Sequence, residues 1–119
     1  MARILIVDDS SVVRLKLRKL LEKFQHDVIE SPNGAAGVKN FRLMKPDLVT
    51  MDINMPEMGG IDAVREIISK HPAAKIIMIS SAAEEDGIVT AVKYGARGYI
   101  LKPFDDARVM QVINRVLSE

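Results

Sequence analysis

The chain has 119 residues, a formal net charge of +1 and no cysteine, and 48% of its residues are hydrophobic and 28% charged. This length suits one domain over residues 1–119, and the composition excludes a disordered or fibrous chain. The small charge argues against a protein that binds nucleic acid over its whole surface, and the lack of cysteine excludes disulfides and thiolate metal sites. Neither a signal peptide nor an apolar run of the roughly 20 residues that span a bilayer is found. We therefore expect a cytoplasmic protein.

Short apolar runs alternate with segments of helical periodicity, a pattern typical of βαβ units around a parallel sheet. The first strand, residues 4–7, precedes a helix that begins near Ser10 or Ser11, whose hydroxyls suit an N-cap. The apolar side chains at helical spacing are Val13, Leu17, Leu20, Leu21 and Phe24. The other face is basic and is expected to be solvated, with Arg14, Lys16, Arg18, Lys19 and Lys23.

The next two units follow the same plan. Residues 27–30 form a short, half-polar strand that suits the edge of a sheet, and the turn at residues 31–34 leads into a helix that ends near Met44. Gly37 inside this helix is unfavourable. The third strand, residues 48–51, precedes a helix over residues 60–70, which ends because Pro72 cannot continue the hydrogen-bond ladder after His71. The side chains expected to point inward are Ile61, Val64, Ile67 and Ile68.

The last two units complete five strand and helix pairs. After the strand at residues 76–79, a helix opens with Glu84, Glu85 and Asp86, which are favourable at the positive end of the helix dipole. Gly87 costs about 1 kcal/mol relative to alanine there, so we expect a movable helix. The fifth strand, residues 99–101, precedes a helix whose apolar stripe is Val109, Val112, Ile113, Val116 and Leu117. Because the strands are apolar at nearly every position, helices must cover both faces, and the sheet is doubly wound.

Polar residues that suit phosphate chemistry follow four of these strands. Asp8 and Asp9 follow the first strand, Asp52 the third, Ser80 the fourth and Lys102 the fifth. Open parallel sheets bind ligands beyond the carboxyl ends of their strands, and strands about 4.8 Å apart would bring Asp52 close to Asp8 and Asp9. Crowded carboxylates take up a proton or bind a cation, and Mg²⁺ commonly bridges carboxylates to phosphate. The sequence therefore predicts a magnesium-assisted phosphoryl site, with Lys102 roughly 10 Å away on a flexible stem.

The segments ILIVDD, VTMDINMPEMGG, IIMISSA and GYILKPF resemble, in this order, the receiver domains of bacterial two-component response regulators. The resemblance covers the whole chain. It implies an α/β, doubly wound (βα)5 fold of the flavodoxin-like, CheY-like kind, with a five-stranded parallel sheet of order 2-1-3-4-5. It also implies a phosphoacceptor with slow autodephosphorylation in chemotaxis-like signalling, and not an enzyme that turns over an external substrate.

The resemblance assigns roles to the acidic residues. Asp52 corresponds to the phosphoacceptor, which takes the phosphoryl group from a phosphohistidine of a sensor histidine kinase. Asp8 and Asp9 correspond to the acids that hold Mg²⁺ together with Asp52, and Asp9 makes the most direct contact. Asn54 corresponds to the position that supplies a backbone carbonyl to the metal.

The resemblance also implies a conformational switch. Ser80 corresponds to the hydroxyl that turns toward the new phosphoryl group, Lys102 to the ammonium that pairs with it, and Tyr99 to the aromatic that moves inward or outward. The Lys102–Pro103 peptide bond corresponds to the family's usual cis peptide, an isomer that the sequence alone does not determine. A downstream protein would dock on the face of the fourth helix, fifth strand and fifth helix, without direct contact with nucleic acid or membrane. Residues 96–99 lack the acid of regulators that dimerise there, which favours a monomer over a phosphorylation-linked dimer.

Other interpretations remain for the individual residues and for the whole site. Taken alone, Asp8 and Asp9 suit a solvated turn or helix cap, Lys102 a surface lysine, Ser80 a strand end and Tyr99 a half-buried sheet position. The alternative function is a haloacid-dehalogenase-like, magnesium-dependent phosphohydrolase, although such enzymes separate their two acids by one residue and carry a substrate cap. A flavin-binding flavodoxin-like protein is disfavoured because two adjacent carboxylates would repel phosphate.

Several positions depart from the family pattern or lie outside the site. Serine at position 80 replaces the more frequent threonine and loosens the switch, and Asn54 and Ala82 occupy positions that adjust the lifetime of the acyl phosphate. No effector domain follows Glu119, so we expect a protein that acts by docking or a part of a longer regulator. The two histidines, His26 and His71, are expected at the surface, and most of the seven methionines in the core.

Overall fold

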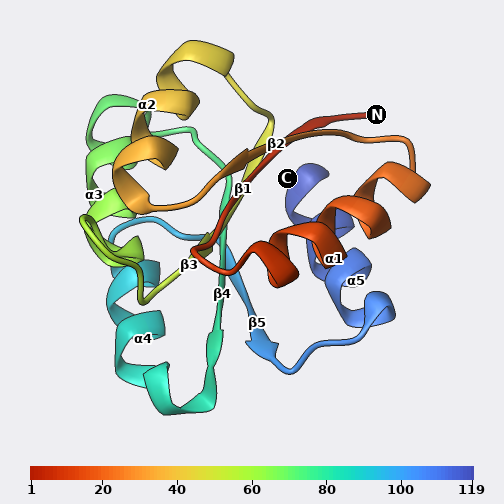
Figure 1. Ribbon diagram of the computed structural model, residues 1–119. Helices are drawn as coiled ribbons and strands as arrows, with labels where there is room; N and C mark the ends of the chain where they lie inside the picture. The colour runs from red at the N-terminus through yellow and green to blue at the C-terminus, as the bar shows by residue number, and fades with distance from the viewer.

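The computed structural model describes all 119 residues and alternates five strands with five α-helices (Figure 1). The strands are β1 (Arg3–Val7), β2 (Asp27–Ser31), β3 (Leu48–Asp52), β4 (Ile76–Ser81) and β5 (Gly98–Lys102). The helices are α1 (Ser11–Lys23), α2 (Gly34–Met44), α3 (Gly60–Lys70), α4 (Glu85–Lys93) and α5 (Asp106–Leu117). All neighbouring strands pair in parallel, in the order β2-β1-β3-β4-β5. The predicted doubly wound α/β fold and its strand order are confirmed, and β2 lies at an edge as expected.

The three inner strands of the sheet, β1, β3 and β4, are buried on both faces because their side chains alternate between two hydrophobic cores. In β3, Val49 and Met51 join the core covered by α2, α3 and α4, whereas Leu48 joins the core covered by α1 and α5. Figure 1 shows these two groups of helices on opposite sides of the sheet. The nearly continuous apolar character of the central strands is therefore explained by the two helical layers that cover them.

Helix α1 begins as predicted, but its buried apolar stripe ends before Phe24. The hydroxyl of Ser10 accepts a hydrogen bond from the Val13 N–H at 3.2 Å, which caps the helix. Leu17, Leu20 and Leu21 are buried and Val13 is partly buried. Phe24 is 51% exposed, so the prediction for Phe24 is wrong. Phe24 is the C-cap, and the next residue, Gln25, has a φ of 68°, so the chain turns away before Phe24 can join the stripe.

The basic face of α1 is only partly a solvated surface. Arg14 and Arg18 both form ion pairs with Glu30 of β2, at 2.9 Å and 2.6 Å. The three lysines of this face are exposed, and the Lys16 ammonium lies 4.9 Å from the centre of the Phe104 ring. The two arginines therefore tie α1 to the edge strand, a contact that the prediction of a solvated face missed.

Close packing explains why helix α2 contains a glycine, which is unfavourable within a helix. A Cβ at Gly37 in α2 would lie 2.9 Å from Cγ2 of Val7, so the absence of a side chain lets α2 approach β1. In α3 the bounds are as predicted, and Val64 and Ile67 are buried. Ile61 and Ile68 are only partly buried, whereas the smaller Ala63 is fully buried.

The start of α4 differs from the prediction. Residues Ala82–Glu84 form a short 3₁₀-helix, η1, and α4 begins one residue later at Glu85. The Glu84 carboxylate accepts a hydrogen bond from the Ser81 N–H at 2.8 Å, so this acid closes the turn before the helix. In α5 the predicted stripe is buried except for Leu117, which is partly buried, and Met110 is buried in addition.

Smaller observations concern one peptide bond, the two histidines and the methionines. The Lys102–Pro103 peptide bond is cis, the isomer that the sequence had left open. His71 is exposed as predicted, but His26 is only partly exposed, and its Nδ1 accepts a hydrogen bond from the Ala2 N–H at 3.0 Å. Five of the seven methionines are buried or partly buried.

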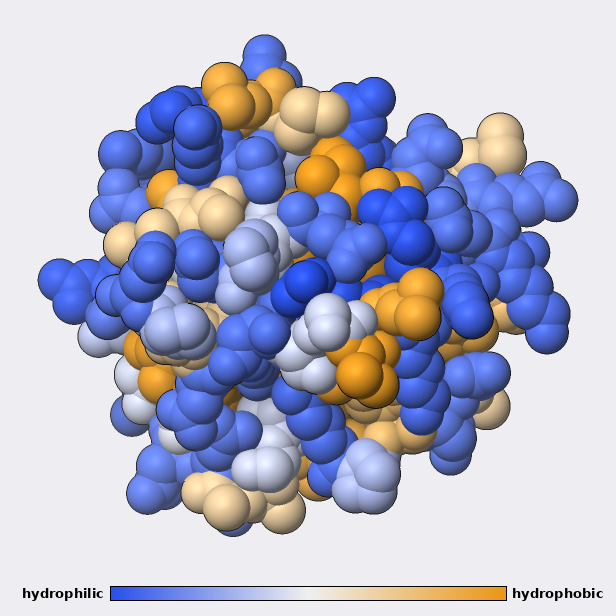
Figure 2. Space-filling model, viewed as in Figure 1, coloured by the Kyte–Doolittle hydropathy of each residue, from blue (hydrophilic) through white to orange (hydrophobic).

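The hydrophobic residues at the surface are scattered. Figure 2 shows hydrophobic residues in small patches among hydrophilic ones on the viewed face. No helix combines the length and the apolar character required to cross a membrane.

Candidate functional site

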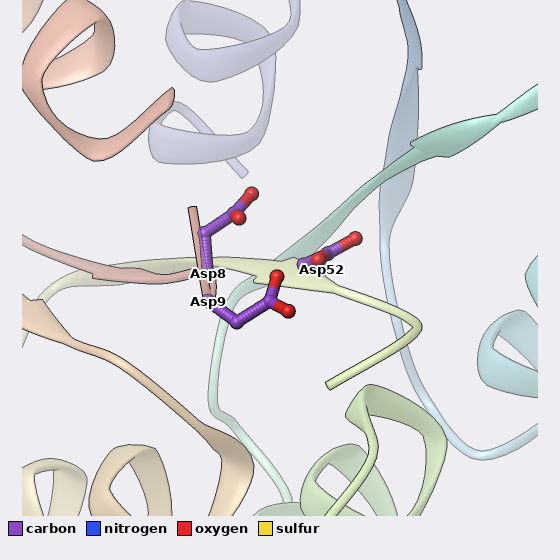
Figure 3. A group of neighbouring side chains, drawn as sticks. All are labelled: Asp8, Asp9 and Asp52. Carbon is purple, nitrogen blue, oxygen red and sulfur yellow. The ribbon is translucent and has the colours of Figure 1, made fainter. Parts of the chain in front are cut away.

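Three aspartates meet at the carboxyl end of the sheet. Asp8 and Asp9 follow β1 and Asp52 ends β3, and each offers a carboxylate oxygen within 4.8 Å of the others (Figure 3). Asp8 and Asp52 are 2% and 5% exposed, whereas Asp9 is exposed. The acidic cluster predicted from the strand ends is therefore present.

The pairing of β1 with β3 explains why the two buried aspartates face each other. Val7 and Met51 are register partners, so the residue after each of them lies at the same height at the end of the sheet. Because side chains alternate along a strand, Asp8 lies on the face of Ile6, and Asp52 on the face of Thr50. This is the face covered by α1 and α5.

Lys102 reaches the acidic cluster from β5. Its Nζ lies 3.3 Å from Oδ2 of Asp8 and 3.4 Å from Oδ1 of Asp52. The strand lies two positions from β3, but the four-carbon stem spans that gap, as the sequence predicted. The ammonium thus contacts both buried carboxylates and leaves the exposed Asp9 without this partner.

The electrostatics of Asp52 are those of a carboxylate that needs a counter-charge. Burial, followed by the negative charge of Asp8, raises the pKa of Asp52 to about 6, although Lys102 acts in the opposite direction. Burial alone would lower the pKa of the Lys102 ammonium, but the attraction of Asp8 and Asp52 outweighs it and the net pKa is raised. Lys102 therefore stays charged. The Asp52 side chain is stabilised when it takes up a proton or when a further cation binds beside it.

The two consecutive aspartates are held differently. Oδ1 of Asp8 accepts a hydrogen bond from the Ser10 N–H at 2.8 Å, and the Asp8 N–H donates to the Ser31 carbonyl at 3.1 Å. The Asp9 side chain makes no hydrogen bond or ion pair, so its oxygens are free. An all-oxygen donor set with one free and two buried carboxylates suits a hard divalent cation such as Mg²⁺.

The loop after β3 carries the last candidate ligand. Asn54 is exposed and follows Asp52 by two residues. The loop closes through a 2.8 Å hydrogen bond from the Gly60 N–H to the Ile53 carbonyl. A Cβ at Gly60 would lie 1.9 Å from the Asp52 carbonyl oxygen, so only glycine lets α3 begin this close to the acidic cluster.

The side chains of Ser80 and Tyr99 make no hydrogen bond to the acidic cluster or to each other. Ser80 is fully buried, and its hydroxyl has no hydrogen-bond partner, an arrangement that costs about 1–3 kcal/mol. Tyr99 is 44% exposed. It lines a hollow of about 310 Å³ together with Ala82, Glu85, Ile88, Val89 and Leu101.

Two residues near the site were missed by the sequence analysis. The Arg14 guanidinium donates a hydrogen bond from Nη1 to the Asp8 carbonyl at 2.7 Å. Its position one turn into the helix that follows the acidic pair was the available signal. Thr50, two residues before Asp52, is buried with an unpaired hydroxyl, and no pattern in the sequence pointed to it.

The similarities to known proteins agree with this geometry. Residues 4–114 match the family described as response regulator receiver domain. The chemotaxis protein CheY of Thermotoga maritima is 44% identical over 115 residues, which are 96% of each chain. The crystal structure of a CheY-like receiver domain protein from Methanospirillum hungatei has a TM-score of 0.94 at 26% identity, and the match covers 99% of this chain and 94% of that one.

The same fold also occurs as a part of larger proteins. The crystal structure of NtrX from Brucella abortus has a TM-score of 0.93 at 28% identity, and the match covers 98% of this chain but only 27% of the NtrX chain. These similarities support a two-component response regulator and do not support the haloacid-dehalogenase-like alternative.

Proposed function

Because the chain belongs to the response regulator receiver domain family, we propose that residues 1–119 form one receiver domain in which Asp52 accepts a phosphoryl group from a sensor histidine kinase. The observation that carries this proposal is the convergence of Asp8, Asp9 and Asp52 beside the Lys102 ammonium. By analogy with the chemotaxis protein that it resembles, the signal would belong to a chemotaxis-like pathway in the cytoplasm.

Asp8, Asp9 and Asp52 would hold Mg²⁺ with their carboxylates, and Asn54 with its backbone carbonyl. When bound, the ion would neutralise the crowded carboxylates and the oxygens of the incoming phosphoryl group. The free Asp9 side chain supports its role as the most direct ligand, since the Asp8 carboxylate is already engaged by Ser10 and Lys102.

In the transfer step, an Asp52 carboxylate oxygen attacks the phosphorus of the phosphohistidine. The new P–O bond forms as the P–N bond breaks, and the electron pair of that bond stays on the imidazole, which takes up a proton. Such a transfer depends on in-line placement and charge neutralisation more than on a strong base. Lys102 supports the reaction because its ammonium lies beside Asp52 and can pair with the phosphoryl oxygens. The product is an acyl phosphate that hydrolyses slowly, without turnover of an external substrate.

The switch would follow from the unpaired hydroxyl of Ser80. The phosphoryl group on Asp52 supplies acceptor oxygens, and Ser80 gains a hydrogen bond by turning toward them. Tyr99 then moves inward and reshapes the hollow between η1, α4 and β5. A downstream protein would bind the face of α4, β5 and α5 with a different affinity, and neither nucleic acid nor membrane would take part.

Intact mass spectrometry after incubation with Mg²⁺ and a small acyl phosphate tests this function. We expect a mass increase of one phosphoryl group per chain, absent without Mg²⁺ and absent in Asp52→Asn. Asp47→Asn is a matched control. The Asp47 carboxylate accepts a hydrogen bond from the Arg3 N–H and does not belong to the acidic cluster, so this change should leave labelling intact. Equal labelling of Asp52→Asn and the wild type would overturn the assignment.

A further inference from the structure

Arg14 links the edge strand to the peptide that joins the two consecutive aspartates. Its Nη1 donates to the Asp8 carbonyl at 2.7 Å, and its Nε donates to Oε1 of Glu30 at 2.9 Å. The side chain is only 18% exposed. None of the other basic side chains of α1 hydrogen-bonds to the acidic cluster.

This contact matters most for Asp9. The Asp8 side chain has partners on both carboxylate oxygens, and its N–H is bonded to β2. The Asp9 side chain has none, so its direction depends on the orientation of the peptide plane between Asp8 and Asp9. The Asp8 carbonyl is part of that plane, and Arg14 is the side chain that holds it.

We propose that Arg14 is a positioning residue for metal binding, which keeps the Asp9 carboxylate beside Asp8 and Asp52 by fixing the Asp8 carbonyl. The inference rests on the proposed function, since it assigns a further residue to the same site. Groups that orient a ligand from outside the metal's direct contacts typically change metal affinity by 10–100-fold when they are removed.

The anchor of Arg14 is rigid enough for this task. Glu30 lies in β2 opposite Ile6 of β1, two residues before Asp8. Its two oxygens receive Arg14 and Arg18 separately, and Arg18 lies 2.6 Å away. The hydrogen bond from Arg18 is the main cause that lowers the pKa of Glu30, burial opposes it, and Arg14 adds to it. Glu30 therefore stays charged and holds Nε of the guanidinium, while Nη1 donates to the Asp8 carbonyl.

The geometry requires arginine. A planar guanidinium donates in two directions at once, to Glu30 and to the Asp8 carbonyl. A lysine ammonium carries the same charge, but its three N–H donors share one nitrogen at the end of a shorter side chain. Arg14→Lys therefore preserves the local charge and breaks the bridge. Arg18→Lys is the matched control, because Arg18 also pairs with Glu30 but bonds to the Val28 carbonyl and not to the acidic loop.

Calorimetric titration with Mg²⁺ alone, together with thermal unfolding in EDTA, tests the proposal. We expect Arg14→Lys to raise the Mg²⁺ Kd about tenfold, and Arg18→Lys to leave it within about twofold of the wild type. Both variants should lose some thermal stability, because each weakens the tie between α1 and β2. The rate of labelling by acyl phosphate should fall in Arg14→Lys at low Mg²⁺ and recover at saturating Mg²⁺.

Arg14→Met separates position from charge. If Arg14 acted only as a nearby positive charge, Arg14→Met would bind Mg²⁺ more tightly and Arg14→Lys would be unchanged. If it positions Asp9, both variants bind Mg²⁺ more weakly. A wild-type Kd in Arg14→Lys, or an equal loss in Arg18→Lys, would overturn the proposal. Absence of Mg²⁺ binding in the wild type would instead refute the proposed function, so the two failures are distinguishable.

Discussion

At the scale of single residues, the site is a set of charges that the fold holds in an unfavourable arrangement. Asp52 is buried beside Asp8, and the one ammonium of Lys102 serves both carboxylates. When both carboxylates are ionised, the site therefore holds two buried negative charges and one positive charge. This imbalance makes the site responsive, since a proton, a metal ion or a phosphoryl group with its counter-ion each changes the charge that Lys102 must balance.

The pH dependence of stability should report this imbalance. The pKa of Asp52 is about 6 in the folded chain, above the value of about 3.9 in an unfolded chain, so its protonated form favours folding. The stabilisation is complete below about pH 4 and is lost as the pH rises through 6. At pH 7.5 in EDTA we therefore expect Asp52→Asn to raise the free energy of unfolding by on the order of 1 kcal/mol.

Urea denaturation at pH 7.5 and at pH 5 measures this effect. The gain from Asp52→Asn should shrink at pH 5, where the folded wild type is mostly protonated at Asp52, and should shrink at pH 7.5 when Mg²⁺ is added. A gain that is the same at both pH values would contradict the electrostatic account.

At the scale of the elements, helix packing decides how far an unfavourable residue is tolerated. Gly37 in α2 and Gly87 in α4 both weaken their helices by propensity, yet their surroundings differ. A Cβ at Gly37 would meet the stiff methyl groups of Val7 at 2.9 Å and 3.0 Å, whereas at Gly87 it would meet the flexible ends of Ile53 and Ile61 at 3.2 Å. Only the first glycine is required by a close contact with the sheet.

This difference predicts opposite outcomes for the same substitution. We expect Gly37→Ala to lower the free energy of unfolding by about 1–3 kcal/mol, because α2 must move away from β1. We expect Gly87→Ala to be neutral or to raise it by up to about 1 kcal/mol, because helix propensity improves and the isoleucine ends can shift. Chemical denaturation measures both. A stabilising Gly37→Ala would show that α2 is not held against Val7 as described.

At the scale of the whole molecule, the parallel sheet brings the residues of the site together. Its register brings the ends of β1 and β3 to one height, and β5 adds Lys102 from two strands away. The same sheet carries Ser80 in β4 and Tyr99 in β5, and Tyr99 lines the hollow beside α4. In the proposed switch, a change at Asp52 would therefore reach an exposed surface through β4 and β5.

The charge pattern at the opposite end of β5 predicts the oligomeric state. The segment before β5 offers Arg97, which is already engaged by Glu119 at 3.7 Å and by the Ala73 carbonyl at 3.2 Å, and it contains no acid to pair with a second copy. We therefore expect a monomer before and after phosphorylation. Light scattering during size-exclusion chromatography, with and without Mg²⁺ and acyl phosphate, checks this, and a dimer that appears only after labelling would contradict it.

The amino-acid sequence by itself determined the fold class and the members of the acidic site. Alternating strand and helix patterns predict a doubly wound sheet, and chain connectivity alone puts Asp8, Asp9 and Asp52 at strand ends. These features depend on local periodicity and on the common edge of parallel strands, so they can be read without coordinates.

Only the tertiary structure decided which side chains support that site. The contact of Arg14 with Glu30 and the Asp8 carbonyl joins residues from α1, β2 and the loop after β1. The sequence shows that Arg14 follows the acidic pair by about one helical turn, but not that it contacts both groups. The unpaired hydroxyls of Thr50 and Ser80, and the space that Gly37 leaves for α2, likewise depend on which atoms lie across the core. Such contacts join distant parts of the chain, so they depend on side-chain packing in the folded protein and not on local sequence.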